Sequence, residues 1–258
     1  MTDAQQDVFT GVGVALLTLL TSNGEVDAAA TGALAADLVS RGVQAVLACG
    51  TTGEPATLTD AERRQVITAV RDALPAGLPV LGGTGAVTAD RAAELTTQAV
   101  ESGADVILAW PPPGSEDLPG YFAAVAAAAQ GRPVLGYHIP WISAPGLPLD
   151  ALDGLPIAGL KDSSGDPDRL IAEITRYRGA TYTGSSALLS LAGPMGGAGA
   201  ILAAANVEPE LACAAFGGDG AAQRGLADVH LAGKAGGPPA LKRLLAERRG
   251  YSPVSRAR

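Results

Sequence analysis

Residues 157–166 contain one lysine whose neighbours in the sequence favour chemistry at its side-chain amine. Small and apolar residues lead into Lys161, and a polar turn that contains Gly165 follows at once. A short apolar run between turn signals is typical of a buried parallel strand. Lys161 is therefore expected at the carboxyl end of a strand, just before the next helix.

The composition makes this lysine more informative. The chain has 15 arginines but only three lysines, and the other two, Lys234 and Lys242, lie in the polar C-terminal segment. An ammonium group near apolar walls loses its proton more readily, and a neutral amine can attack a ketone to form a Schiff base. The alternative is a strand-end lysine whose stem is packed and whose charge reaches solvent.

Length and composition favour one barrel-sized soluble protein. The chain has 258 residues, and a (β/α)8 barrel typically needs about 250. It is 47% hydrophobic and 17% charged, which is enough apolar material for a sizeable core. The net charge of −8 argues against nucleic-acid binding, because a basic surface is the usual footprint of that function.

The sequence has no pattern typical of a membrane span, a signal peptide or a metal site. No apolar run approaches the roughly 20 residues that span a membrane, and the polar first residues do not form a signal peptide. Cys49 and Cys213 form no CxxC pair and the chain has two histidines, so we expect neither a metal site nor a cofactor. A reduced, cytoplasmic setting is expected.

Eight short apolar runs alternate with helix patterns, and this order predicts the fold. Helix N-cap signals stand at Asp27, Thr59, Thr88 and Asp166. The predicted fold is a (β/α)8 TIM barrel over 1–216, with 217–258 as a C-terminal helical segment and frayed tail of the same domain. A doubly wound open sheet is the alternative, but it lacks a GxGxxG loop after its first strand. The predicted strands are 11–17, 43–49, 79–83, 104–110, 133–137, 157–161, 180–183 and 199–203.

The helix that follows Lys161 is also predicted in detail. Asp166 and Pro167 are expected as its N-cap and first residue. Leu170, Ile171 and Ile174 are expected to form its buried stripe.

In TIM barrels the chemistry takes place at the carboxyl ends of the strands. A lysine that faces a phenol and hydroxyls there suits imine chemistry, in which the lysine condenses with a 2-oxo group and a neighbouring carbon–carbon bond breaks or forms. Tyr137, helped by Thr51, would move the protons. Backbone N–H groups of the turn 50–53 would hold a substrate carboxylate. The residues placed at strand ends are Thr51, Thr52, Thr84, Trp110, Tyr137, Lys161, Ser185, Ser186 and Asn206.

Each of these residues also has an ordinary structural interpretation. Tyr137 can be a core tyrosine with a locally satisfied hydroxyl, and Thr51 and Thr52 can serve only the turn. For Ser185 and Ser186 a helix N-cap is the favoured interpretation.

Four motifs together resemble the dihydrodipicolinate synthase / N-acetylneuraminate lyase family over about residues 11–206. The resemblance implies a (β/α)8 barrel and a class I aldolase, a carbon–carbon lyase that acts on pyruvate-type oxo acids, commonly as a homo-oligomer of two or four chains. It implies that Lys161 forms the Schiff base, Tyr137 transfers protons and Thr51 relays them. Thr52 would bind the carboxylate, and Ile201 would form part of the pocket wall. Gly53, from the turn 50–53, and Ser185, from the strand-end residues, are further predicted substrate-binding residues. The motifs are Gly50-Thr51-Thr52-Gly53-Glu54, Gly83-Thr84-Gly85, Tyr137-His138-Ile139-Pro140 and Gly159-Leu160-Lys161-Asp162-Ser163-Ser164-Gly165.

The sequence departs from the family in two places near the expected site. Where relatives often carry Thr-Pro-Tyr-Tyr, with a tyrosine that reaches the neighbouring subunit, this chain has Trp110-Pro111-Pro112-Pro113. The arginine that resembles a carboxylate clamp after Tyr-x-x-Pro is missing, and Trp141 starts that stretch instead. Its loss removes a charge-assisted hydrogen bond worth roughly 1.5–3 kcal/mol.

These departures shape the predicted specificity. Trp110 and Trp141 either wall a less polar acceptor pocket or fill space left by the missing tyrosine. We predict a class I aldolase that joins or cleaves a small-molecule 2-oxo acid and an aldehyde without a second carboxylate, with no nucleic-acid or membrane partner. The alternatives are a 4-hydroxy-tetrahydrodipicolinate synthase with an atypical acceptor site and a non-catalytic barrel that binds oxo acids.

Overall fold

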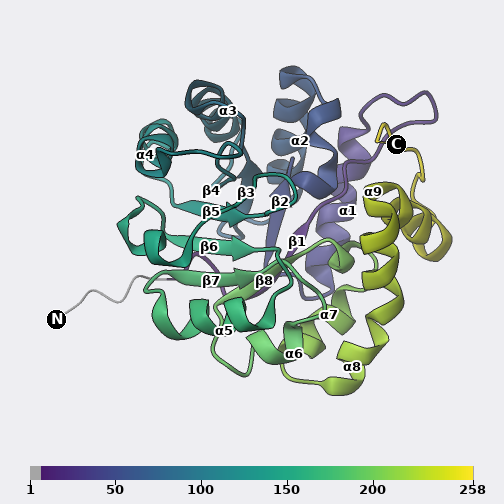
Figure 1. The fold of residues 1–258 in the computed structure, drawn as a ribbon. Coiled ribbons are helices and arrows are strands. Elements are labelled where there is room, and N and C mark those ends of the chain that lie inside the picture. Colours follow the sequence, from purple (N-terminus) through teal and green to yellow (C-terminus); the bar gives the residue numbers. More distant parts are fainter. Residues whose placement is uncertain (1–6, 258) are drawn as a thin grey trace.

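Eight parallel strands pair in chain order, and β8 pairs with β1 to close a barrel (Figure 1). The structure is a computed structural model, and it describes residues 7–257. The closed barrel confirms the predicted fold. The strands are Gly11–Ala15 (β1), Ala45–Ala48 (β2), Val80–Gly83 (β3), Val106–Ala109 (β4), Val134–His138 (β5), Gly159–Asp162 (β6), Ala180–Thr183 (β7) and Gly199–Leu202 (β8).

Helices lie around the outside of the barrel, and their starts follow the predicted caps. The Asp27 carboxylate accepts a hydrogen bond from the Ala30 N–H at 2.9 Å, and Thr59 forms a reciprocal capping box with Glu62. Thr88 and Asp166 cap in the same way. The helices are Ala28–Ser40 (α1), Asp60–Ala73 (α2), Ala89–Glu101 (α3), Leu118–Ala128 (α4), Pro167–Arg176 (α5), Leu189–Ala192 (α6), Pro209–Phe216 (α7), Gly220–Gly225 (α8) and Ala227–Arg249 (α9).

Strand β2 is shorter than its apolar run because backbone geometry ends it. Cys49 has a φ of 55°, so β2 stops before it although the residue is apolar and buried. The chain then enters the short 3-10 helix Thr51–Gly53, and Glu54 follows with a φ of 56°. The predicted turn after β2 is thus a tight one, built on two non-glycine residues in left-handed conformation.

A stacked aromatic pair lies at the amino-terminal end of the barrel. The rings of Phe9 and Tyr182 lie 4.6 Å apart between centroids. The Tyr182 hydroxyl donates to the Phe9 carbonyl at 2.8 Å and accepts from the Phe9 N–H at 3.1 Å. This pair therefore fills part of the barrel interior at its amino-terminal end.

Two predictions about helix faces and caps are wrong. Ile171 is 38% exposed, whereas the Glu173 side chain is fully buried against the barrel. A glutamate can occupy this face because Arg169, one turn earlier, lies 2.7 Å from its carboxylate. Neither Ser185 nor Ser186 caps a helix, because α6 starts at Leu189 and has Leu188 as its N-cap residue.

Helix α9 lies at the carboxyl-end side of the strands, the side toward which β6 and β7 point in Figure 1. It is kinked at Gly237, whose φ of 55° and ψ of −148° are not helical. Two prolines follow the kink, and Pro is favoured at the start of a helical segment. Among the described helices, α9 included, none is both long and apolar enough to cross a lipid bilayer.

The second half of α9 is anchored by a buried ion pair. Lys242 is fully buried, and its Nζ lies 2.6 Å from Oε1 of Glu54, the residue that follows the 3-10 helix after β2. The same ammonium donates to the carbonyl of Val254 at 2.9 Å. Burial raises the pKa of Glu54, but Lys242 and the backbone N–H of Ala257 outweigh burial, and the net shift is downward.

The predicted frayed tail is wrong for the residues that the structure describes. The N–H groups of Arg256 and Ala257 donate to the Glu54 carboxylate at 2.8 and 2.7 Å. The Arg256 guanidinium lies 2.7 Å from Glu62 of α2 and donates to the Thr57 carbonyl. The tail therefore runs across the turn after β2 and holds it against α2.

We predict that Lys242→Met will lower the free energy of unfolding by about 3–5 kcal/mol, because it leaves the buried Glu54 carboxylate without its cation. Urea unfolding followed by circular dichroism measures the loss. The double variant Glu54→Gln with Lys242→Met should recover much of it, because it removes both buried charges. A loss below about 1 kcal/mol in the single variant would show that the pair is not an anchor.

Candidate active site

A cavity of about 570 Å³ opens where the strands end, and most of the predicted site residues line it. Seven of the nine lie on its wall, and only Gly53 and Trp110 do not. Their positions along the chain range from β2 to β8, so closure of the barrel is what brings them together. The seven are Thr51, Thr52, Tyr137, Trp141, Lys161, Ser185 and Ile201.

Lys161 lies inside the barrel, near the end of β6. Its side chain is 3% exposed, and strand register places it between Tyr137 of β5 and Tyr182 of β7. Lys161 Nζ lies 4.3 Å from the centroid of the Tyr137 ring. The lysine therefore presents a nearly buried amine to the cavity, with a phenol ring beside it.

A hydroxyl that the sequence analysis did not single out contacts this phenol. The Ser163 hydroxyl donates to the Tyr137 hydroxyl at 3.1 Å, and both residues line the cavity. Ser163 follows Lys161 by two residues, just past the end of β6. In the sequence, Ser163 was indicated by its membership of the motif at residues 159–165.

The turn after β2 offers backbone donors, although not from Gly53. The Gly53 N–H donates to the Gly50 carbonyl at 2.8 Å, and the Gly53 carbonyl accepts from the Thr18 hydroxyl. Because the Gly53 N–H is used within the 3-10 turn, we expect the N–H groups of Thr51 and Thr52 to bind the substrate carboxylate. Within the described residues no hydrogen bond occupies the N–H groups of these two threonines.

The two tryptophans have different surroundings. Trp110 packs over Gly85 and against the barrel interior, and its carbonyl accepts from the Tyr121 hydroxyl at 2.7 Å. It is thus a packing residue and does not wall the cavity. Trp141 is 59% exposed and lines the mouth of the cavity, where Lys234 Nζ lies 5.2 Å from its ring centroid.

Helix α9 contributes two polar residues that the sequence analysis missed as site residues. His230 and Lys234 line the cavity, and the Ser186 hydroxyl lies 2.9 Å from Nδ1 of His230. Burial lowers the pKa of His230, and the charge of Lys234 lowers it further. The available signal was their spacing of four residues, which puts both side chains on one face of a helix.

Some strand-end residues support the structure and do not line the cavity. Asn206 is fully buried and bonds the backbone at Leu17 and Ala15, which ties the end of β8 to β1. Thr84 accepts from Thr96 of α3 at 3.0 Å. These contacts satisfy buried polar groups and explain why the sequence has polar residues there.

A buried charge cluster supports Lys161 from the outer side of β6. Asp162 accepts from the Ser164 N–H at 2.7 Å, and Arg169 of α5 lies 3.8 Å from Asp162 and 2.7 Å from Glu173. Burial raises the pKa of Asp162. Burial, reinforced by Asp162, raises the pKa of Glu173 to about 8. Glu173 therefore holds its proton to a higher pH than an exposed glutamate does, although Arg169 opposes the shift.

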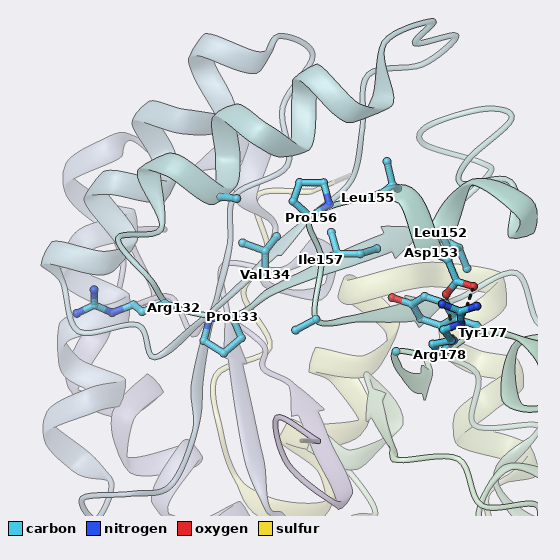
Figure 2. Close-up of a pocket in the computed structure, with 13 residues that line it drawn as sticks. Arg132, Pro133, Val134, Leu152, Asp153, Leu155, Pro156, Ile157, Tyr177 and Arg178 are labelled. Carbon is cyan, nitrogen blue, oxygen red and sulfur yellow. Dashed lines mark hydrogen bonds and ion pairs between the residues drawn. The ribbon is translucent and has the colours of Figure 1, made fainter. Parts of the chain in front are cut away.

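A second cavity of about 540 Å³ lies at the opposite end of the barrel, before β5, β6 and β7 (Figure 2). Pro133 and Ile157 line it, and Asp153 forms an ion pair with Arg178 at its edge. None of the predicted site residues reaches it. The amino-terminal face of a TIM barrel serves stability in known enzymes, so we assign the chemistry to the first cavity.

Comparison with known proteins gives the same family as the motifs. The model of the Dihydrodipicolinate synthetase family matches residues 8–221. The 4-hydroxy-tetrahydrodipicolinate synthase of Salinibacter ruber is 32% identical over 81% of this chain and 73% of its own length. The enzyme of the same name from Thioalkalivibrio sulfidiphilus is 36% identical over 83% of this chain and 78% of its own.

A solved structure agrees with the sequence relatives. The chloride-inhibited dihydrodipicolinate synthase from Acinetobacter baumannii, complexed with pyruvate, superposes with a TM-score of 0.83 at 26% identity. The match covers 96% of this chain and 94% of that one. The chain belongs to the dihydrodipicolinate synthetase family. The predicted enzyme class, a carbon–carbon lyase of the class I aldolase type acting on a 2-oxo acid, is confirmed at the level of this family.

We predict that Glu173 makes this family member less stable as the pH rises. Its pKa is about 8 when folded and near its ordinary 4.5 when unfolded, so between these values the native state holds a proton that the unfolded state has lost. The free energy of unfolding should therefore fall across this window. Glu173→Gln should flatten the fall between about pH 5 and pH 8.

Urea unfolding at a series of pH values measures this effect. The exposed Glu247→Gln provides the matched control, because it removes a carboxylate from solvent and should leave the slope unchanged. Equal slopes in wild type and Glu173→Gln would show that Glu173 is ionised throughout.

Proposed function

We propose that Lys161 forms a Schiff base with pyruvate and that the resulting enamine joins an aldehyde, or is released from one in the reverse direction. The observation that carries this proposal is the position of Lys161. Its amine is nearly buried, lies 4.3 Å from the Tyr137 ring centroid and faces a cavity lined by hydroxyls. A surface lysine reaching for solvent would not have this burial.

The proposed reaction begins with attack on the oxo group. The Lys161 amine adds to C2 of pyruvate, a C–N bond forms, and the carbonyl oxygen leaves as water after two proton transfers. The iminium then draws electrons from C3, which loses a proton and becomes the nucleophilic carbon of an enamine. That carbon attacks the aldehyde carbonyl, and water finally hydrolyses the imine to free Lys161.

Tyr137 and Ser163 are the proposed proton carriers. A phenol and an aliphatic hydroxyl in hydrogen-bond contact can pass a proton in either direction. The Ser163 contact supports a relay within one chain, because its hydroxyl reaches the phenol without help from a second subunit. Thr51 lines the same cavity, and we keep it as a second hydroxyl near the reacting carbon.

The N–H groups of Thr51 and Thr52 are the proposed site for the pyruvate carboxylate. Two adjacent N–H groups without partners at the start of a turn form a small anion-binding concavity. Ile201, from β8, supplies an apolar wall for the same substrate. Together these groups would orient C2 toward the amine.

A specific observation also supports the synthase alternative. Curated relatives at 32% and 36% identity are named 4-hydroxy-tetrahydrodipicolinate synthase. Against it, the stretch 141–146 has no arginine at the place where the family resemblance implies a clamp for the acceptor carboxylate of that reaction. We therefore propose the general aldolase as the function and keep the synthase as the second candidate.

Assembly and location remain proposals as well. We propose a homo-oligomer, as the family resemblance implies, and a cytoplasmic setting. The two free cysteines, Cys49 and Cys213, support a reducing compartment.

Borohydride trapping tests the function directly. Pyruvate with borohydride should add one pyruvate-derived mass to the peptide that contains Lys161, and Lys161→Ala should abolish both the adduct and turnover. Tyr137→Phe should still be trapped but should lose about 10² to 10⁴ in turnover, because only the proton carrier is missing. An adduct on Lys234 or Lys242 would refute the assignment, and trapping without turnover in the wild type would favour the non-catalytic binder.

A further inference from the structure

The first half of α9 forms one side of the active-site cavity. His230 and Lys234 lie one turn apart on this helix and line the cavity together with Trp141. Lys161, Thr51 and Thr52 line the same cavity from the barrel. A volume of about 570 Å³ leaves room for an acceptor beside a three-carbon oxo acid, since pockets of about 300–1,000 Å³ hold drug-sized ligands.

The charge of this cavity is opposite to that of the protein. Its lining includes Lys161 and Lys234 but no aspartate or glutamate, although the chain as a whole carries a net charge of −8. A cavity of one sign attracts ligands of the other and raises their local concentration. In an acidic protein, such a cavity favours an anion over a neutral aldehyde.

Lys234 is a cation without a carboxylate partner among the described residues. The ion pairs of the described chain include Lys242 but not Lys234. Lys234 is exposed at the mouth of the cavity, and its Nζ lies 5.2 Å from the centroid of the Trp141 ring. A cation held over an aromatic ring keeps its positive charge and its hydrogen-bond donors for a ligand.

His230 and Ser186 complete a polar surface next to this lysine. The hydrogen bond of 2.9 Å between the Ser186 hydroxyl and His230 Nδ1 links α9 to the loop after β7 and fixes the imidazole ring. This side of the cavity thus carries an ammonium, an imidazole and a hydroxyl. Trp141 lines the same cavity, so these polar groups lie beside part of the apolar wall that the tryptophans predicted.

We propose that Lys234 binds an anionic group, a carboxylate or a phosphate, on the acceptor aldehyde, with His230 and Ser186 on the polar side of the same subsite. This proposal rests on the proposed function, because it names the second substrate of that reaction. Lys234 reaches the acceptor from the C-terminal helix and supplies the positive charge that the missing arginine after Tyr137-His138-Ile139-Pro140 would supply. The expectation of an acceptor without a second charged group is replaced by an acceptor that carries one.

Two matched pairs of aldehydes test the proposal, each assayed with pyruvate. Succinic semialdehyde is compared with butanal, and glyceraldehyde 3-phosphate with glyceraldehyde, so that each pair differs mainly by the anionic group. The wild type should prefer the anionic member by kcat/KM, and the pair with the larger preference tells carboxylate from phosphate.

The variant Lys234→Met should lower the ratio of anionic to neutral kcat/KM about ten-fold, the size of one charge-assisted hydrogen bond. Arg243→Met is the matched control, because Arg243 is an exposed cation of α9 that does not line the cavity. It should leave the ratio unchanged.

Three outcomes overturn the proposal. A wild type that prefers the neutral aldehydes shows that the acceptor subsite does not bind anions. A ratio that Lys234→Met leaves unchanged, or lowers no more than Arg243→Met does, shows that Lys234 makes no specific contact with the anionic group. If borohydride traps no pyruvate adduct, the proposed function itself fails and the acceptor subsite fails with it, whereas normal trapping with either of the first two results refutes the subsite alone.

Discussion

The buried ion pair between Glu54 and Lys242 is the interaction on which the site's arrangement depends. Glu54 directly follows the turn that carries Thr51 and Thr52, and Lys242 belongs to the helix that carries His230 and Lys234. A buried carboxylate must keep its cation, so the turn and the second half of α9 hold one fixed relative position. The kink at Gly237 joins this half to the one that carries His230 and Lys234. The C-terminal residues bond to the same carboxylate and reinforce that position.

The closed barrel and the C-terminal helix thus contribute different groups to the candidate active site. The barrel aligns Lys161 with Tyr137 through strand register, and the cavity where the strands end is the face proposed for substrates. The helix covers part of that face and adds the polar groups that the barrel lacks. This division fits TIM barrels in general, where loops and extensions vary the specificity while the strand ends keep the chemistry.

The sequence predicts the site residues that local patterns mark, and it misses those that depend on contacts between distant parts of the chain. Lys161, Tyr137 and Thr51 were predicted together because apolar runs and turn residues mark strand ends locally. The pairing of Ser186 with His230 links positions 44 residues apart, and no local pattern carries it. The burial of Glu173 in place of Ile171 was missed for a related reason. It depends on Arg169, which lies near both Glu173 and Asp162 of β6.

The central claim is that Lys161 is the nucleophile and that the turn after β2 holds the carboxylate. A crystal structure of the protein grown with pyruvate tests both parts at once. The account predicts continuous electron density from Lys161 Nζ to C2 of pyruvate, with the carboxylate within hydrogen-bond distance of the Thr51 and Thr52 N–H groups. Pyruvate bound without a covalent bond to Lys161, or attached to another lysine, would contradict it.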